Sequence, residues 1–115
     1  MPTLTRLAPE LPARDLNASL AYYEDRLGFE IKTVLIEQGY AIVERDGMAI
    51  HLFASERDSA AGLHLFTEEL EPLHDELSGR GARIAQPVER KPWGNRDFRV
   101  IDPAGNELKF TEPLR

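Results

Sequence analysis

Two polar residues stand at matching places in the two halves of this chain, and their types suit contact with a ligand. His51 comes four residues after Gly47, and Lys109 comes four residues after Gly105. Each lies in a segment where apolar and polar residues alternate, so each side chain points to the polar side of a strand. A protonated lysine repels a metal ion, whereas histidine and lysine together can line a pocket. The pair therefore favours an organic ligand over a metal centre.

Other side chains that can bind ligands or transfer protons share this polar side in four predicted strands. On the opposite side these strands carry only aliphatic and aromatic residues, namely Leu7, Leu11, Ile50, Leu52, Leu63, Leu65, Leu108 and Phe110. The polar side mixes charges with rings, as pockets commonly do, and it includes Glu10, His51, Phe53, His64, Phe66, Glu107 and Lys109. We predict that the apolar side packs under helices and that the polar side lines a cup.

The roles of the charged and titratable members of this set stay open. Glu10 and Lys109 can pair with each other or contact a ligand, because buried charges are usually compensated. His51 and His64 can form pocket walls, bind a metal loosely or exchange protons, because histidine titrates near neutral pH.

The composition describes one acidic domain. The chain has 115 residues, a formal net charge of −6 and no cysteine. Nucleic-acid binding needs a basic surface, so this charge argues against it; the charge suits a cationic small molecule or serves solubility alone. Without cysteine there is no disulfide, thiolate nucleophile or cysteine zinc site. No apolar run approaches the roughly 20 residues of a membrane span, so we expect a cytoplasmic protein with no membrane partner.

The first half is predicted to form a strand, a helix and three more strands. Asp15 is a favourable N-cap for the helix, which Gly28 ends. Asp46-Gly47 predicts a tight hairpin between the last two strands. The predicted strands cover residues 7–13, 29–36, 40–44 and 48–54.

The same order of elements repeats after a polar linker at residues 56–61. Leu70, Leu73 and Leu77 line one side of a second helix, which ends at Gly79 and Gly81. The predicted strands of this half cover residues 62–67, 83–88, 96–101 and 106–111. The repeat predicts a single α+β domain over residues 1–115, made of two βαβββ modules at about 1–55 and 62–115.

Several segments resemble the vicinal oxygen chelate superfamily, which includes glyoxalase I, extradiol dioxygenases and bleomycin-resistance proteins. The resemblance covers nearly the whole chain. Its residues are Ala13-Arg14-Asp15-Leu16, Tyr22-Tyr23, Leu27-Gly28-Phe29, Pro92-Trp93-Gly94-Asn95-Arg96-Asp97-Phe98 and Asp102-Pro103-Ala104-Gly105-Asn106. It implies a U-shaped mixed β-sheet around a cup, helices on the outer face of the sheet, and usually a homodimer.

The enzymes of this superfamily hold a divalent metal with one residue from each of four strands. The matching positions in this chain are Ala8, His51, Gly62 and Lys109, with His64 as the nearest substitute for Gly62. Alanine and glycine have no side-chain donor, and a protonated lysine repels a metal. The resemblance therefore implies a protein without a metal or other cofactor.

The metal-free branch of the superfamily binds drugs. The resemblance to it implies a protein that sequesters a bleomycin-type antibiotic, confers resistance and does no chemistry on the drug. Trp93, on a predicted loop, would stack on a planar part of the drug or, alternatively, cover the core. The expected ligand-binding residues are Glu10, Tyr40, His51, Phe53, His64, Trp93, Glu107 and Lys109.

Two other functions stay open at this level. An enzyme of the glyoxalase or dioxygenase type, a lyase or oxidoreductase, would need an unusual metal site made by His51, His64 and Glu107. A structural or regulatory protein would keep only a vestigial cup. Metal analysis tests the enzyme, and a cup filled by its own side chains would support the structural role.

Overall fold

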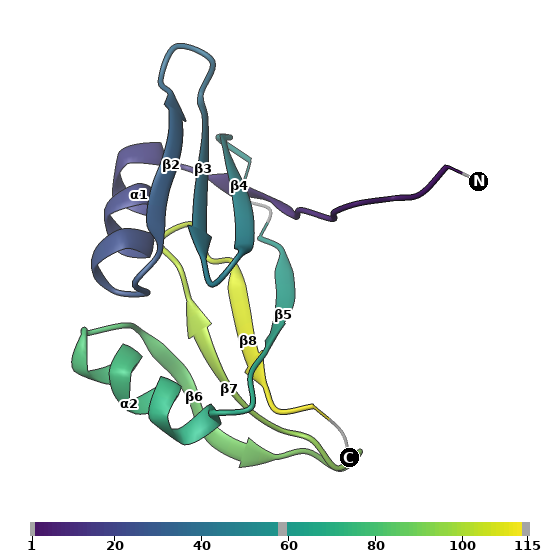
Figure 1. The fold of residues 1–115 in the computed structure, drawn as a ribbon. Helices are drawn as coiled ribbons and strands as arrows, with labels where there is room; N and C mark the ends of the chain where they lie inside the picture. Colours follow the sequence, from purple (N-terminus) through teal and green to yellow (C-terminus); the bar gives the residue numbers. More distant parts are fainter. Residues whose placement is uncertain (1, 58–59, 114–115) are drawn as a thin grey trace.

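Each half of the chain folds as a strand, a helix and three further strands in the computed structural model, which describes residues 2–57 and 60–113 (Figure 1). The first half contains β1 (Glu10–Ala13), α1 (Leu16–Asp25), β2 (Glu30–Leu35), β3 (Tyr40–Arg45) and β4 (Met48–Ala54). The second half contains β5 (Gly62–Phe66), α2 (Leu70–Gly79), β6 (Ile84–Arg90), β7 (Arg96–Ile101) and β8 (Glu107–Thr111). The predicted α+β fold of two βαβββ modules is confirmed.

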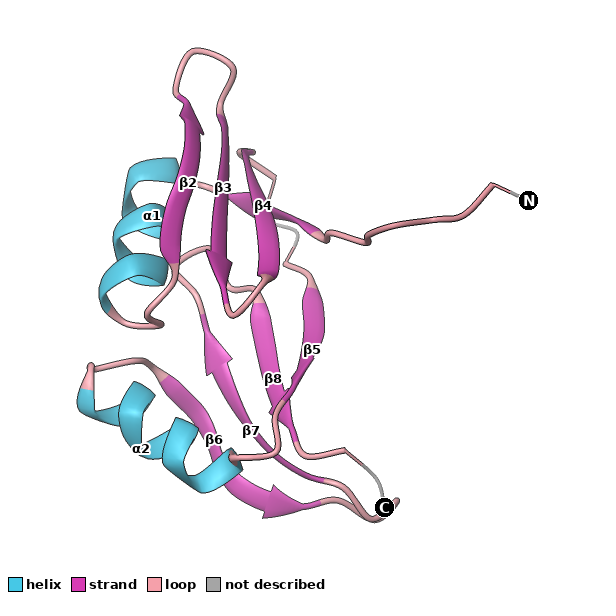
Figure 2. Ribbon diagram, viewed as in Figure 1, coloured by secondary structure: helices cyan, strands magenta, loops and turns pink. Residues whose placement is uncertain are grey.

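Each module has its own four-stranded mixed sheet. Sheet A has the strand order β1-β4-β3-β2, and sheet B has the order β5-β8-β7-β6. The first pair in each sheet is parallel, and equivalent residues face each other in the two: Glu10 lies opposite His51, and His64 lies opposite Lys109. The helices α1 and α2 lie on the same side of the molecule (Figure 2), which leaves the other side of both sheets to the polar residues.

Both helices begin and end near the predicted residues. The Asp15 carboxylate accepts a hydrogen bond from the backbone N–H of Ala18 at 3.1 Å, as an N-cap does. Helix α2 begins after Glu69, which makes no side-chain cap. Among the described residues, no helix is long and apolar enough to cross a membrane.

The hairpin between β3 and β4 follows directly from its two turn residues. Asp46 has φ of 52° and Gly47 has φ of 78°. A two-residue turn of type I′ requires positive φ at both positions, and Asp-Gly adopts it more easily than most pairs. The turn sets the register that places Ile42 opposite His51 and Tyr40 opposite Phe53.

The core lies between the apolar sides of the sheets and the two helices. Leu11, Ile50, Leu52 and Leu108 are at most 2% exposed, as predicted from their alternation. Leu63 and Leu65 on the edge strand β5 are only partly buried, whereas Leu11 on the edge strand β1 is fully buried.

The prediction for the beginning of the first strand was wrong. Residues 2–9 form no regular element, and residues 2–7 are exposed on a segment that extends away from the body of the molecule (Figure 1). Leu7, expected in the core, is 92% exposed. Pro9 has no backbone N–H to donate to a sheet, and the pairing of β1 with β4 begins only at Glu10.

A buried polar network joins the two modules. The Asp102 carboxylate accepts from the Tyr23 hydroxyl at 2.8 Å and from the side-chain amide of Asn106 at 2.9 Å. The same Asn106 amide donates to the carbonyl of Pro12 at 2.8 Å, and its oxygen accepts from the N–H of Ala61 at 2.9 Å. The Asp102–Asn106 turn therefore holds β1, α1 and the linker together. These contacts explain the polar residues of the turn by a structural role, without a ligand.

Candidate functional site

Four of the eight predicted ligand-binding residues lie together on the polar side of sheet A, a group named wall A: Glu10, Tyr40, His51 and Phe53. The Tyr40 hydroxyl donates to Glu10 Oε2 at 2.8 Å, and its oxygen lies 2.5 Å from His51 Nδ1. The Tyr40 and His51 rings meet edge to face, with centroids 5.6 Å apart. Parallel pairing of β1 with β4 and antiparallel pairing of β3 with β4 bring these residues together.

The environment of wall A keeps the Tyr40 phenol protonated. Desolvation raises the pKa of Tyr40 above its ordinary value of 10.0, and the hydrogen bond to Glu10 and the Glu10 charge raise it further. All three causes disfavour a phenolate, since a second negative charge would form beside a carboxylate. Tyr40 therefore acts as a hydrogen-bond donor and acceptor in this wall.

Three more predicted residues lie together on the polar side of sheet B, a group named wall B: His64, Glu107 and Lys109. The Lys109 ammonium lies 3.6 Å from Glu107 Oε1. His64 Nδ1 lies 2.9 Å from Thr111 Oγ1, and the His64 ring stacks on Phe66 with centroids 6.0 Å apart. Of the two alternatives left open for Glu10 and Lys109, the structure does not show their mutual ion pair, because Glu10 bonds to Tyr40 and Lys109 lies near Glu107, each on its own sheet.

Trp93 is the eighth predicted residue, and it belongs to neither wall. It lies in the loop between β6 and β7 and is 61% exposed. Among the described residues, no aromatic contact joins its ring to wall A or wall B. Its exposure argues against the alternative in which this ring covers the core.

Sequence reasoning missed a second group of charges beside wall B. Asp97 on β7 is 1% exposed, and its Oδ1 accepts from the Gln86 side-chain amide at 2.7 Å. Its other oxygen lies 3.4 Å from Arg99, which in turn lies 3.5 Å from Glu107. Lys91 Nζ is 3.9 Å from Asp97 Oδ1. The alternation of β7 puts Asp97 and Arg99 on the polar side, a signal that was available in the sequence.

The walls differ in charge. Wall A contains one carboxylate and no lysine or arginine, whereas wall B is bordered by Arg99 and Lys91 in addition to Lys109. These cations are compensated by Glu107 and Asp97. Wall B is therefore close to neutral as a group, whereas wall A keeps the charge of Glu10, and a ligand that contacts both walls meets different polar groups.

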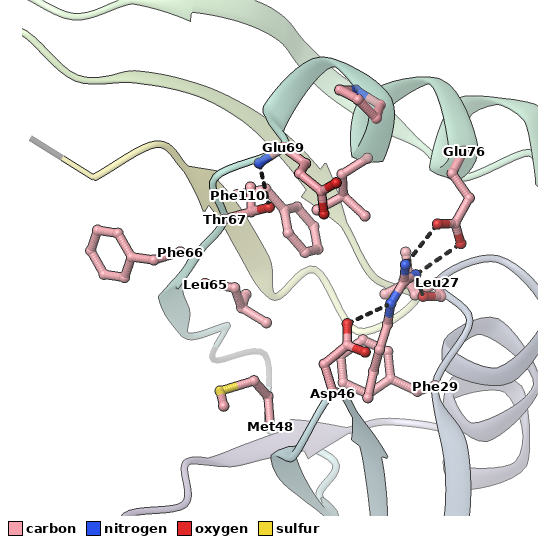
Figure 3. A pocket seen from close by; sticks show the side chains of 13 residues that line it. Leu27, Phe29, Asp46, Met48, Leu65, Phe66, Thr67, Glu69, Glu76 and Phe110 are labelled. Atoms are coloured by element: carbon pink, nitrogen blue, oxygen red, sulfur yellow. Dashed lines mark hydrogen bonds and ion pairs between the residues drawn. The ribbon is translucent and has the colours of Figure 1, made fainter.

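A hollow of about 440 Å³ lies apart from these walls, between the two modules. Figure 3 shows apolar side chains at its base, among them Leu27, Phe29, Leu65 and Phe110. At its rim, Arg45 pairs with Glu76 at 2.6 Å. None of the eight predicted ligand-binding residues lines this hollow, so its shape gives no support to their assignment.

The residues named for the alternative metal site are not brought together. His51 lies on sheet A, whereas His64 and Glu107 lie on sheet B. Within residues 2–57 and 60–113, no three His, Cys, Asp or Glu side chains gather in a way that would hold a metal ion. The donor set of one chain therefore does not fit the three protein ligands of a catalytic zinc site.

Comparison with known proteins agrees with this fold. The family model of the Glyoxalase/Bleomycin resistance protein/Dioxygenase superfamily matches residues 4–110. A bleomycin resistance protein of Geobacillus stearothermophilus is 25% identical over 130 aligned residues, which cover 93% of this chain and 96% of that protein.

Two solved structures are similar over almost their entire length. A bleomycin resistance determinant encoded on the transposon Tn5 has a TM-score of 0.85 and 25% identity, and the match covers 97% of this chain and 100% of that one. A bleomycin-binding protein from bleomycin-producing Streptomyces verticillus, complexed with copper(II)-bleomycin, has a TM-score of 0.80 and 27% identity, with 99% and 100% covered. The chain belongs to the Glyoxalase/Bleomycin resistance protein/Dioxygenase superfamily.

Proposed function

We propose that this protein binds a bleomycin-type glycopeptide antibiotic and confers resistance by sequestering it. Binding takes place without a metal of the protein's own and without chemical change to the drug. The observation that carries the proposal is the pair of walls, each of which combines charge with an aromatic or imidazole ring on an otherwise regular sheet. Relatives named bleomycin resistance protein, and one solved in complex with copper(II)-bleomycin, support this class of ligand.

Lys109 supports binding without a resident metal. It stands at a position where the superfamily's enzymes have a metal ligand, and its ammonium is 3.6 Å from the Glu107 carboxylate. A paired ammonium has no lone pair to offer a metal, because its nitrogen binds through three N–H donors. Such a group suits an acceptor on an organic ligand instead.

A second copy of the chain completes the site in this proposal. The four residues of wall A and the three of wall B lie on separate sheets. A homodimer that sets wall A of one subunit against wall B of its partner would enclose a ligand from both sides. Glu10 leaves an uncompensated carboxylate in wall A, and Lys109 in wall B has ammonium hydrogens beyond its contact with Glu107, so the two walls offer a ligand different polar groups.

The charge of the chain also favours a cationic drug. Its formal net charge is −6, and Glu10 provides a carboxylate within wall A. An acidic surface raises the local concentration of a cation and the rate of encounter. We place this action in the cytoplasm, where a protein without cysteine loses nothing to the reducing conditions.

Calorimetric titration of bleomycin into chelator-treated protein tests the proposal. We expect saturable binding of about one drug per subunit, with submicromolar affinity and a rise in melting temperature, since a ligand stabilises the state that it binds. If the titration produces no heat and the drug causes no thermal shift, bleomycin is rejected as the ligand.

Sedimentation at the same protein concentration tests the dimer separately. A monomer that still binds the drug would contradict enclosure by two subunits. Near-stoichiometric iron, nickel, manganese or zinc in the purified protein would instead favour the metal-dependent alternative.

A further inference from the structure

The Tyr40 hydroxyl in wall A has two hydrogen-bonding partners but only one hydrogen. Its oxygen lies 2.8 Å from Glu10 Oε2 and 2.5 Å from His51 Nδ1. An ionised carboxylate can only accept, so the hydroxyl hydrogen goes to Glu10. The contact with His51 then needs a hydrogen from the histidine, and Nδ1–H must donate to the Tyr40 oxygen.

This order of donors decides the tautomer of His51. A neutral imidazole carries one hydrogen, and here it lies on Nδ1. Nε2 is left with a lone pair. It is shielded from solvent, and no described side chain or backbone group donates to it.

His64 in wall B repeats this arrangement with different atoms. The Thr111 hydroxyl lies 3.2 Å from the Lys109 carbonyl, which can only accept. His64 Nδ1 lies 2.9 Å from the same hydroxyl oxygen, and it is the donor there when the Thr111 hydrogen points to the carbonyl. His64 is an exposed residue on the polar side of sheet B, so a ligand can approach its ring.

We propose that Glu10 with Tyr40, and Thr111 in the other half, are positioning residues that hold His51 and His64 as neutral rings protonated on Nδ1. Each wall then offers an Nε2 lone pair to an N–H or O–H donor of the ligand. This inference rests on the proposed function only for the identity of the ligand, because the tautomers belong to the free protein.

A ligand donor would relieve an existing cost at His51. A buried polar atom without a partner costs on the order of a hydrogen bond. A donor that displaces the side chains around Nε2 supplies the missing partner. A ligand with no N–H or O–H group at this place leaves the lone pair unpaired, so the two rings select for donor-rich ligands such as amides, amines and sugars.

Long-range proton–nitrogen NMR of the imidazole rings tests the proposal in free protein. The spectra are recorded at increasing alkaline pH until the ring nitrogen shifts no longer change, so that the neutral form of each ring is observed. His51→Gln and His64→Gln assign two of the three histidines. We expect both rings to show a protonated Nδ1 and an unprotonated Nε2.

Two matched variants separate the two halves. Tyr40→Phe removes the acceptor of His51 and should shift that ring toward the Nε2–H form while His64 stays unchanged. Thr111→Val should shift the His64 ring toward the Nε2–H form while His51 stays unchanged. Glu10→Ala should also shift His51 toward the Nε2–H form, because the Tyr40 hydroxyl can then donate its hydrogen to Nδ1. A protonated Nε2 at His51 in the unaltered protein, or a His51 ring insensitive to both Tyr40→Phe and Glu10→Ala, would overturn the proposal.

Titration of bleomycin into the same labelled sample distinguishes this inference from the proposed function. If both rings are protonated on Nδ1 but the protein binds no drug, bleomycin is rejected as the ligand and the tautomer assignment stands. If the protein binds the drug but the rings are protonated on Nε2, the tautomer assignment is rejected and the proposed function stands. If the rings are locked and the drug binds, the Nε2 resonances must move at saturation, and unmoved resonances would overturn the acceptor role.

Discussion

Tyr23 donates its phenolic hydrogen to Asp102 across the boundary between the two modules, at 2.8 Å and with both side chains buried. The two residues are 79 positions apart in the chain. Desolvation and then the Asp102 charge raise the pKa of Tyr23 well above its ordinary value, so the phenol keeps this hydrogen. The bond joins helix α1 to the turn before β8, and it is one of several contacts that hold the two modules together.

Removing that hydrogen bond should destabilise the protein. Tyr23→Phe leaves one oxygen of a buried carboxylate with one donor fewer, and we expect the free energy of unfolding to fall by about 1–3 kcal/mol. Denaturant unfolding measures it. Tyr22→Phe is the matched control, since the Tyr22 hydroxyl accepts a bond from the Arg83 N–H at an exposed place. An equal loss in both variants would contradict a special role for the Asp102 contact.

The ion pair between Arg45 and Glu76 should make stability depend on pH. Arg45 donates to both Glu76 oxygens, at 2.6 and 2.9 Å. The hydrogen bond from Arg45 is the main cause that lowers the pKa of Glu76 below its ordinary value of 4.5. A lowered pKa in the folded state means that the unfolded chain binds the proton first as pH falls. The contribution is therefore present above about pH 4.5 and is lost as the pH falls through the lower, folded value.

Glu76→Gln tests that expectation. At neutral pH we expect a loss of roughly 0.5–1 kcal/mol, a modest value because the Glu76 side chain is 36% exposed and water screens the pair. The difference from the unaltered protein should shrink as pH falls below about 4.5. A difference that stays constant down to pH values near 3 would show that lost packing, not charge, explains the variant.

Glu10 should control the ionisation of Tyr40. Its hydrogen bond and its charge both raise the Tyr40 pKa, after desolvation. In Glu10→Gln the charge is gone, so we expect one of the three tyrosine steps in a spectrophotometric titration to move to lower pH. Glu44→Gln is the control, because Glu44 lies on the same strand as Tyr40 without bonding to it. Three unchanged steps in Glu10→Gln would mean that Glu10 and Tyr40 are not paired in solution.

Asp97 should matter more for stability than its exposed neighbour. It is 1% exposed and lies near Arg99 and Lys91. Asp97→Ala leaves two partly buried cations less compensated, and we expect a loss of about 3 kcal/mol in unfolding free energy. Glu89→Gln removes an exposed partner of the same lysine and should cost about 1 kcal/mol or less. Similar melting temperatures for the two variants would contradict this difference.

Trp93 should contribute to ligand binding. It is 61% exposed on its loop, and truncation of an aromatic anchor typically weakens binding by about 1–3 kcal/mol, or roughly 5- to 150-fold. Trp93→Ala is compared with Ile36→Ala, which truncates another exposed apolar side chain, at the turn between β2 and β3. Unchanged bleomycin affinity in Trp93→Ala would remove this residue from the proposed site.

The sequence by itself determined the features that depend on a few neighbouring residues. Asp15 caps a helix and Asp46-Gly47 makes a hairpin because each acts through its own backbone and the next few residues. Alternation correctly sorted Leu11, Ile50, Leu52 and Leu108 from the polar side, because successive side chains of a strand point to opposite faces. The repeated order of elements then predicted two equal modules.

Only the tertiary structure decided which of these residues meet. Leu7 has the right spacing for the core, yet it is exposed because pairing begins after Pro9. Glu10 and Lys109 both have the right chemistry for an ion pair, but they lie on different sheets and take Tyr40 and Glu107 as partners. The pairing of β1 with β4 and of β5 with β8 joins residues that are distant in the chain, and no local pattern specifies where such a pairing begins.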